Sequence, residues 1–63
     1  MNLSQIKKAV KQNKKVYWSN EAYEVRHWEY GHWVVYCTIN DHAVGLTDIN
    51  GKMTHEEKDF YIN

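Results

Sequence analysis

One cysteine and four histidines are the side chains best suited to metal binding or nucleophilic attack. Imidazole nitrogen and thiolate sulfur are ordinary zinc ligands, and a thiol beside a histidine is the minimal set for covalent catalysis. Their spacing matches no closed zinc pattern, because there is one cysteine and the pair His27 and His32 flanks a glycine turn instead of lying on a helix. We therefore expect no metal, no cofactor and partly exposed histidines. The remaining candidate ligands are Cys37, His42 and His55.

Cys37 lies in a strongly alternating segment that places it on one strand face with Trp33, Val35 and Ile39. A thiol in apolar surroundings behaves as a small hydrophobic group, with a raised pKa and little reactivity. The pattern therefore favours a core cysteine over a catalytic one.

Paired carboxylates are the remaining basis for acid–base chemistry. Glu56, Glu57 and Asp59 form an acidic run near the end of the chain. Acid–base catalysis needs one carboxyl group removed from water, whereas a short polar run is typical of a solvated surface. A chain of 63 residues also has little room for a pocket of the usual several hundred Å³. We predict no catalytic residues and no enzyme.

The aromatic residues are concentrated: seven of the nine lie between Tyr17 and Tyr36. Trp, Tyr and Arg dominate the energetics of protein interfaces. We predict an exposed aromatic binding patch around one hairpin end. Its members are Trp28, Tyr30, His32 and Trp33. The pattern also assigns rings to the core, namely Tyr17 or Trp18, Tyr23, Trp33 and Tyr36.

Charge is distributed unevenly although the net charge is zero. Residues 1–15 contain five lysines and no acid, and the remainder is correspondingly acidic. Lys7, Lys11 and Lys14 form a basic edge on the predicted helix that could follow phosphate groups. The alternative is a solvated helix face, paired in part with the acidic half of the chain. A nucleic-acid-binding protein usually shows a net basic excess, which this chain lacks.

These side chains must be positioned by one helix and a series of short strands. Asn2 and Gln5 form a capping-box pattern before an apolar stripe at helical spacing, which predicts a helix over about 3–13. Alternating and β-branched segments, separated by Asn, Asp and Gly turns, predict strands. Their expected ranges are 15–18, 22–30, 32–39, 43–47, 52–54 and 60–62.

The order of elements predicts an α+β fold in one domain over residues 1–63. We expect the N-terminal helix to pack on a strongly bent antiparallel sheet of four to six short strands, or on a small SH3-like barrel. A lone cysteine excludes a disulfide within the monomer, and together with the absence of a signal-type N-terminus it predicts a cytoplasmic protein. Apolar runs are too short to cross a membrane, so no membrane partner is expected.

Four segments resemble small proteins encoded by phages and bacterial mobile elements. They are Lys15 to Val25, Cys37-Thr38, Gly45-Leu46-Thr47 and Glu57 to Ile62. The resemblance covers most of the chain and implies a phage or prophage accessory protein that acts by binding. It implies no catalytic or binding residues.

The sequence therefore predicts a small non-enzymatic protein that docks to a host macromolecule, most simply a host protein. The first alternative is a nucleic-acid-binding protein that uses the lysine-rich helix and exposed rings. The second is a subunit of a homodimer or larger homo-oligomer with a structural role.

Overall fold

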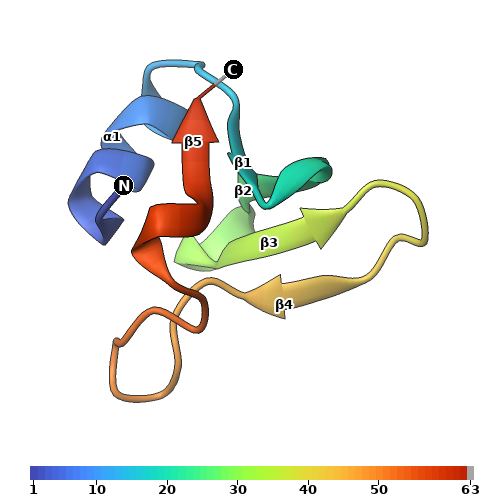
Figure 1. Ribbon diagram of the computed structural model, residues 1–63. Helices are drawn as coiled ribbons and strands as arrows, with labels where there is room; N and C mark the ends of the chain where they lie inside the picture. The colour runs from blue at the N-terminus through green and yellow to red at the C-terminus, as the bar shows by residue number, and fades with distance from the viewer. Residues whose placement is uncertain (63) are drawn as a thin grey trace.

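A computed structural model describes residues 1–62 and shows one N-terminal helix and a five-stranded antiparallel sheet (Figure 1). The predicted α+β class is confirmed. The elements are α1 (Leu3–Lys11), β1 (Val16–Trp18), β2 (Asn20–His27), β3 (Trp33–Cys37), β4 (Ala43–Gly45) and β5 (Phe60–Ile62), with short 3₁₀ turns at Glu29–Gly31 and Glu57–Asp59.

The helix begins at the predicted capping box. The Asn2 side chain accepts a hydrogen bond from the Gln5 backbone N–H at 2.8 Å, and the Asn2 N–H donates to Gln5 Oε1 at 2.9 Å. Two of the donors that a helix leaves unpaired at its N-terminus are thereby satisfied. The helix ends at Lys11, earlier than expected, and Asn13 takes the left-handed conformation (φ 65°) that turns the chain toward β1.

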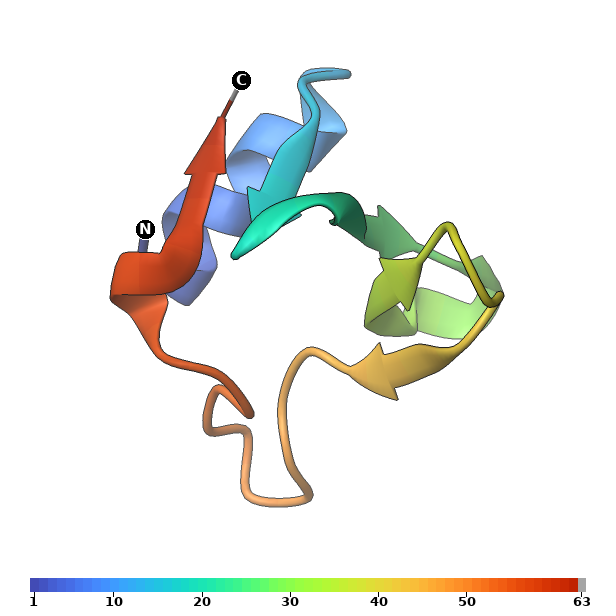
Figure 2. The same cartoon turned by 45° about the vertical axis from the view of Figure 1, so that its right-hand side comes forward.

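The sheet has the strand order β4-β3-β2-β1-β5, so the first and last strands of the chain lie side by side. Every pair is antiparallel. Figure 2 shows the strands curling around, with β4 and β5 as separate edges. The bent sheet is thus confirmed, and the closed barrel is not formed.

The first two strand connections differ from the expected turns. β2 begins at Asn20, because the chain reverses at Ser19 alone, which has a positive φ of 64°. At the other end β2 stops at His27, since Glu29–Gly31 forms a 3₁₀ turn where a strand to residue 30 was predicted. Gly31 (φ 77°) supplies the left-handed conformation of this tight connection.

The later strands are shorter than predicted. β3 ends at Cys37, and Ile39, expected in the core, lies in the following turn and is 82% exposed. β4 ends at Gly45, where an added Cβ would lie 3.2 Å from the Thr47 carbonyl oxygen, so the backbone approaches closely at this glycine. The predicted strand 52–54 was wrong: this segment contributes one isolated bridge, between Thr47 and Met53.

The hydrophobic core lies on the inner face of the sheet, which is defined as the face against which α1 packs. Ile6 and Ala9 of α1 meet alternate strand residues, together with one residue that follows β4. The strand alternation explains this, because positions two apart point to the same side. The core residues are Ile6, Ala9, Val16, Val25, Val35, Leu46 and Phe60, with Trp18, Tyr23 and Trp33 packed against them.

Leu46 tests whether the segment after β4 is held in this core. Leu46 is 0% exposed and Ile49, in the next turn, is 99% exposed. We expect Leu46→Ala to lower the free energy of unfolding by about 2–5 kcal/mol, because it removes buried methyl groups and leaves a cavity. Ile49→Ala, the matched control, should change it by less than about 0.5 kcal/mol. Chemical denaturation measures both values, and equal effects would contradict the packing.

Candidate binding surface

A row of side chains crosses all five strands on the outer face, the side opposite α1. Tyr61 is paired with Tyr17, Tyr17 with Glu24, Glu24 with Tyr36, and Tyr36 with Ala43. Directly opposed residues of antiparallel strands project to the same side of a sheet. The register therefore collects three tyrosines from β5, β1 and β3 on one surface.

The rings of this surface contact one another in two groups. The Tyr17 and Tyr61 rings lie 5.8 Å apart, tilted by 40°. Trp28, which follows β2, meets the edge of Tyr36 with 6.1 Å between ring centroids. The Arg26 guanidinium lies 4.3 Å from the Tyr36 ring centre, in cation–π geometry. We call Tyr17, Arg26, Trp28, Tyr36 and Tyr61 together the tyrosine face.

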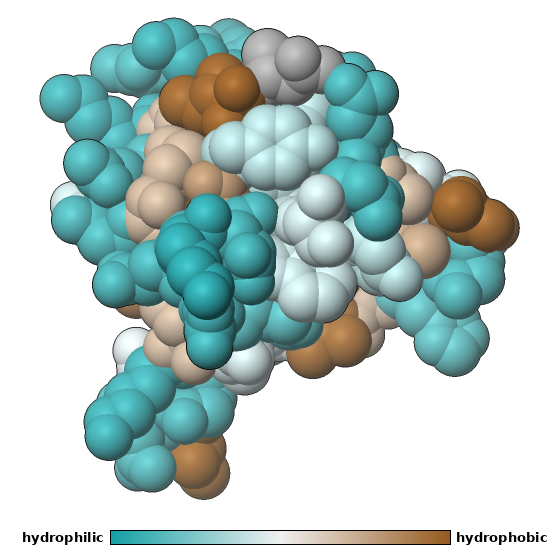
Figure 3. Space-filling view, in the orientation of Figure 1, coloured by the Kyte–Doolittle hydropathy of each residue, from teal (hydrophilic) through white to brown (hydrophobic). Residues whose placement is uncertain are grey.

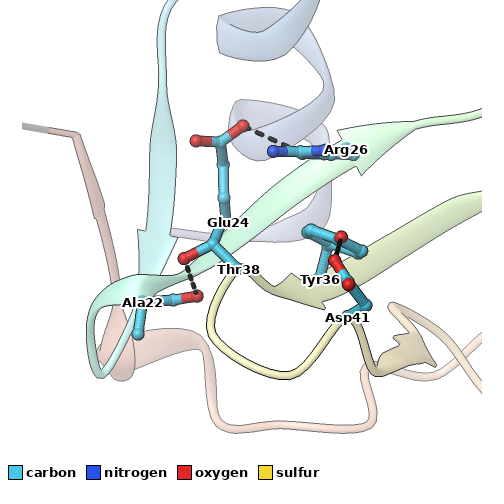
Figure 4. A network of polar contacts seen from close by, with 6 residues as sticks. All are labelled: Ala22, Glu24, Arg26, Tyr36, Thr38 and Asp41. Atoms are coloured by element: carbon cyan, nitrogen blue, oxygen red, sulfur yellow. Dashed lines mark hydrogen bonds and ion pairs between the residues drawn. The ribbon is translucent and has the colours of Figure 1, made fainter.

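Polar contacts hold the centre of the tyrosine face in place (Figure 4). The Arg26 Nε donates to Glu24 Oε1 at 3.1 Å. The Tyr36 hydroxyl donates to Asp41 Oδ1, from the turn that follows β3. Planar side chains fixed in this way lose little further conformational entropy on binding a partner.

Strongly apolar side chains are scattered over the molecule and do not form one patch. Ile39, Val44, Ile49 and Ile62 are all exposed, and they come from separate turns and edges. In Figure 3 the strongly hydrophobic groups stand apart, while side chains of intermediate hydropathy occupy the centre of the view. The exposed aliphatic side chains therefore do not form a single surface, unlike the tyrosine face.

The predicted aromatic patch is divided between the two faces of the sheet. Trp28 is 44% exposed and lies on the outer face with Tyr36. Trp33 lies on the inner face, where its ring stacks on His27 at 4.1 Å and 7°. The Lys7 Nζ lies 5.6 Å from the same Trp33 ring. Trp33 is thus one of the rings that pack against the core, and it does not share a surface with Trp28.

Tyr30 and His32 lie in the connection between β2 and β3, and both are exposed. Tyr30 is 94% exposed and has a positive φ of 62°. This conformation is unfavourable for a bulky residue, and such strain is often found at functional positions. His32 contributes its backbone, since its carbonyl accepts from the Trp28 N–H at 2.7 Å.

The predicted basic edge lies along α1 and the chain that follows it. Lys7 and Lys11 border a shallow hollow along α1 with Lys8, and Lys14 borders another beside Ile62. Ion pairs join Arg26 to Glu24 and Lys58 to Glu56, and neither of these two pairs involves a lysine of α1.

Of the residues considered for chemistry, Cys37, His42 and His55 line one hollow on the inner side of the sheet, whereas His27 and His32 do not. Cys37 is buried and forms no disulfide, as expected for a core thiol. No group of three or more His, Cys, Asp or Glu side chains in residues 1–62 is arranged to hold a metal ion. No helix in the same range is long and apolar enough to cross a membrane.

Sequence reasoning missed four members of the tyrosine face. Arg26 was left out of the predicted patch, Tyr36 was assigned to the core, Tyr17 was left as an alternative to Trp18, and Tyr61 was placed only in the strand 60–62. The core contains Trp18 instead, and Tyr36 faces outward. Alternation within a segment indicates that Glu24, Arg26 and Trp28 share one face. It does not show that Tyr36, on the next strand, lies on the same face, because that depends on how the strands pair.

No family model, curated protein or solved structure matches this chain. The resemblance to phage and mobile-element proteins therefore stays a prediction, and the proposed function depends on the surface of this protein.

Tyr36 provides a test of the hydrogen bond at the centre of this face. The bond to Asp41, with a smaller effect of burial, raises the pKa of Tyr36 above its ordinary value of 10.0. We expect Asp41→Ala to lower the Tyr36 pKa toward that value, as followed by ring-carbon chemical shifts during a pH titration. Asp48→Ala, which removes a carboxylate from a different turn, should leave it unchanged.

The same bond sets a direction for stability. A raised pKa means that the folded state holds the phenol proton more tightly, so the contribution is present below pH 10 and is lost as pH rises through the folded pKa. The stability difference between wild type and Asp41→Ala should therefore narrow at strongly alkaline pH, and the part that remains reflects the left-handed backbone of Asp41 (φ 59°), which alanine disfavours. A constant difference at all pH values would contradict the assignment.

Proposed function

We propose that this protein is a non-enzymatic binding module that docks to another protein through the tyrosine face. The observation that carries the proposal is the register row, which places Tyr61, Tyr17 and Tyr36 on the side that α1 leaves open. Arg26 and Trp28 complete a set of the residue types that dominate interface hot spots. The resemblance to phage proteins supports a bacterial host protein in the cytoplasm as the partner.

The charges of the face favour a protein over a nucleic acid. Its arginine is already paired with Glu24 at 3.1 Å, and Asp41 adds a second carboxylate beside Tyr36. Phosphate binding draws its affinity from unpaired Lys and Arg, which this face does not concentrate. A mixed surface of rings, one guanidinium and two carboxylates suits the polar rim and aromatic centre of a protein interface.

Tyr30 is a further exposed ring at the hairpin end. It follows Trp28 by two residues, and its almost complete exposure leaves its ring without a structural role in the fold. The left-handed backbone at Tyr30 already holds the ring in solvent, where a partner could cover it. We propose Tyr30 as a contact residue together with Trp28.

Comparative affinity capture from a bacterial lysate tests this function. We expect a defined host protein to bind wild type. The amount captured should fall at least about tenfold with Trp28→Ala and with Tyr61→Ala, which lie at opposite ends of the face. Ile49→Ala, which truncates an even more exposed apolar side chain in a different turn, should retain it. Circular dichroism must show that all variants are folded.

Capture that is insensitive to both variants would overturn the proposed face. Loss with Ile49→Ala as strongly as with Trp28→Ala would do the same, because it would indicate general hydrophobic adhesion.

One observation favours the nucleic-acid alternative: the described ion pairs leave the lysines of α1 unpaired. If this helix binds phosphates, the logarithm of affinity must fall steeply with the logarithm of salt concentration. Replacing Lys7, Lys11 and Lys14 by Gln should then reduce the slope by about 3. Fluorescence anisotropy with labelled DNA and RNA measures this. Steep, lysine-dependent binding would place the function on α1 instead of the tyrosine face.

A further inference from the structure

A hollow of about 250 Å³ opens on the inner side of the sheet, at the end away from Lys7. Its lining comes from β1 to β4, from the turn between β3 and β4, and from the segment before β5. It includes Trp18, Cys37, Asn40, His42, Val44 and His55. Because none of them belongs to the tyrosine face, this hollow is a separate feature of the molecule.

Flat rings form one wall of the hollow. Trp18 meets Tyr23 edge to face, with 5.0 Å between ring centroids. His55 packs against Trp18 at 4.3 Å and 61°. Val44 is half exposed, whereas the Cys37 thiol is buried. Such a lining of rings and small apolar groups is suited to a flat apolar ligand.

The polar groups that line the hollow include imidazoles and an amide, and none of the lining side chains is a carboxylate. His55 Nδ1 contacts Thr54 Oγ1 at 2.9 Å, which leaves its second ring nitrogen for another partner. His42 and Asn40 add an imidazole and an amide. The Trp18 indole N–H is buried with no hydrogen-bond partner among the described residues. An unpaired buried donor is uncommon and is often explained by a ligand or water.

The volume restricts the size of any occupant. The hollow of about 250 Å³ equals the liquid volume of roughly eight water molecules. Common ligand pockets begin at about 300 Å³, so only a single substituted ring fits.

We propose that this hollow binds a small aromatic carboxylate, with its ring against Trp18 and Val44 and its anionic group toward His42 and His55. The aromatic wall recognises the ring. The two imidazoles provide donors for the carboxylate, and the lining contains no acidic group that would repel it.

Two-dimensional ¹H–¹⁵N NMR of the whole protein with benzoate as the probe tests this site. The three tryptophans report separately through their indole N–H signals. We expect saturable shifts of the Trp18 indole and of His42 and His55, with a dissociation constant of about 1 mM or below. Trp28 should not move. Intermolecular NOEs from the benzoate ring to the Val44 methyl groups would place the ring.

Comparison probes and variants separate the parts of the proposal. Benzyl alcohol should bind at least about fivefold more weakly, because it keeps the ring and lacks the charge. Val44→Trp should abolish the shifts by filling the hollow, whereas Ile39→Trp, at an exposed turn, should not.

Three results would overturn the site. They are the absence of shifts at millimolar benzoate, shifts confined to the lysines of α1, and equal binding of benzyl alcohol. Because the NOEs use the wild-type chain, the test does not depend on the variants folding. Trp28→Ala should bind benzoate normally, so failure here is distinguishable from failure of the proposed protein-binding function.

Discussion

The packing of Ile6 and Ala9 against the valines of the sheet determines which surface this protein presents. α1 is nine residues long and the only α-helix in the described chain, so it covers one face of the sheet. A chain of this size buries only about 60% of the surface that its unfolded form exposes. Its aromatic residues therefore divide by strand alternation: Trp18, Tyr23 and Trp33 join the core, and the tyrosine face remains in contact with solvent.

Local signals in the sequence predicted most of the fold. The capping box at Asn2, the left-handed Asn13 and the alternation around Val25 and Val35 each depend on neighbouring residues. The shared surface could not be predicted in the same way. It depends on the register of strands far apart in the chain and on a bulge between Tyr17 and Trp18, and a shift of one residue would reverse the face of every side chain.

Separation of the α1 lysines from the tyrosine face gives the molecule distinct surfaces. The sequence suggested that lysines and rings act together. In the structure the Lys7 Nζ does lie 5.6 Å from the Trp33 ring centre. That pair, however, lies on the inner side, while Trp28 and Tyr36 lie on the outer side. Composition counts residues without regard to the sheet, so it could not show that the predicted patch combined residues from opposite faces.

The central claim is that Tyr17, Tyr36 and Tyr61 share the face that α1 does not cover. A NOESY spectrum of the free protein tests it most directly. The account predicts ring contacts between Tyr17 and Tyr61 and between Trp28 and Tyr36, with no contact from these rings to the methyl groups of Ile6 or Ala9. Contacts from Tyr17 or Tyr36 to those methyl groups would contradict the account, because they would place the tyrosines in the core.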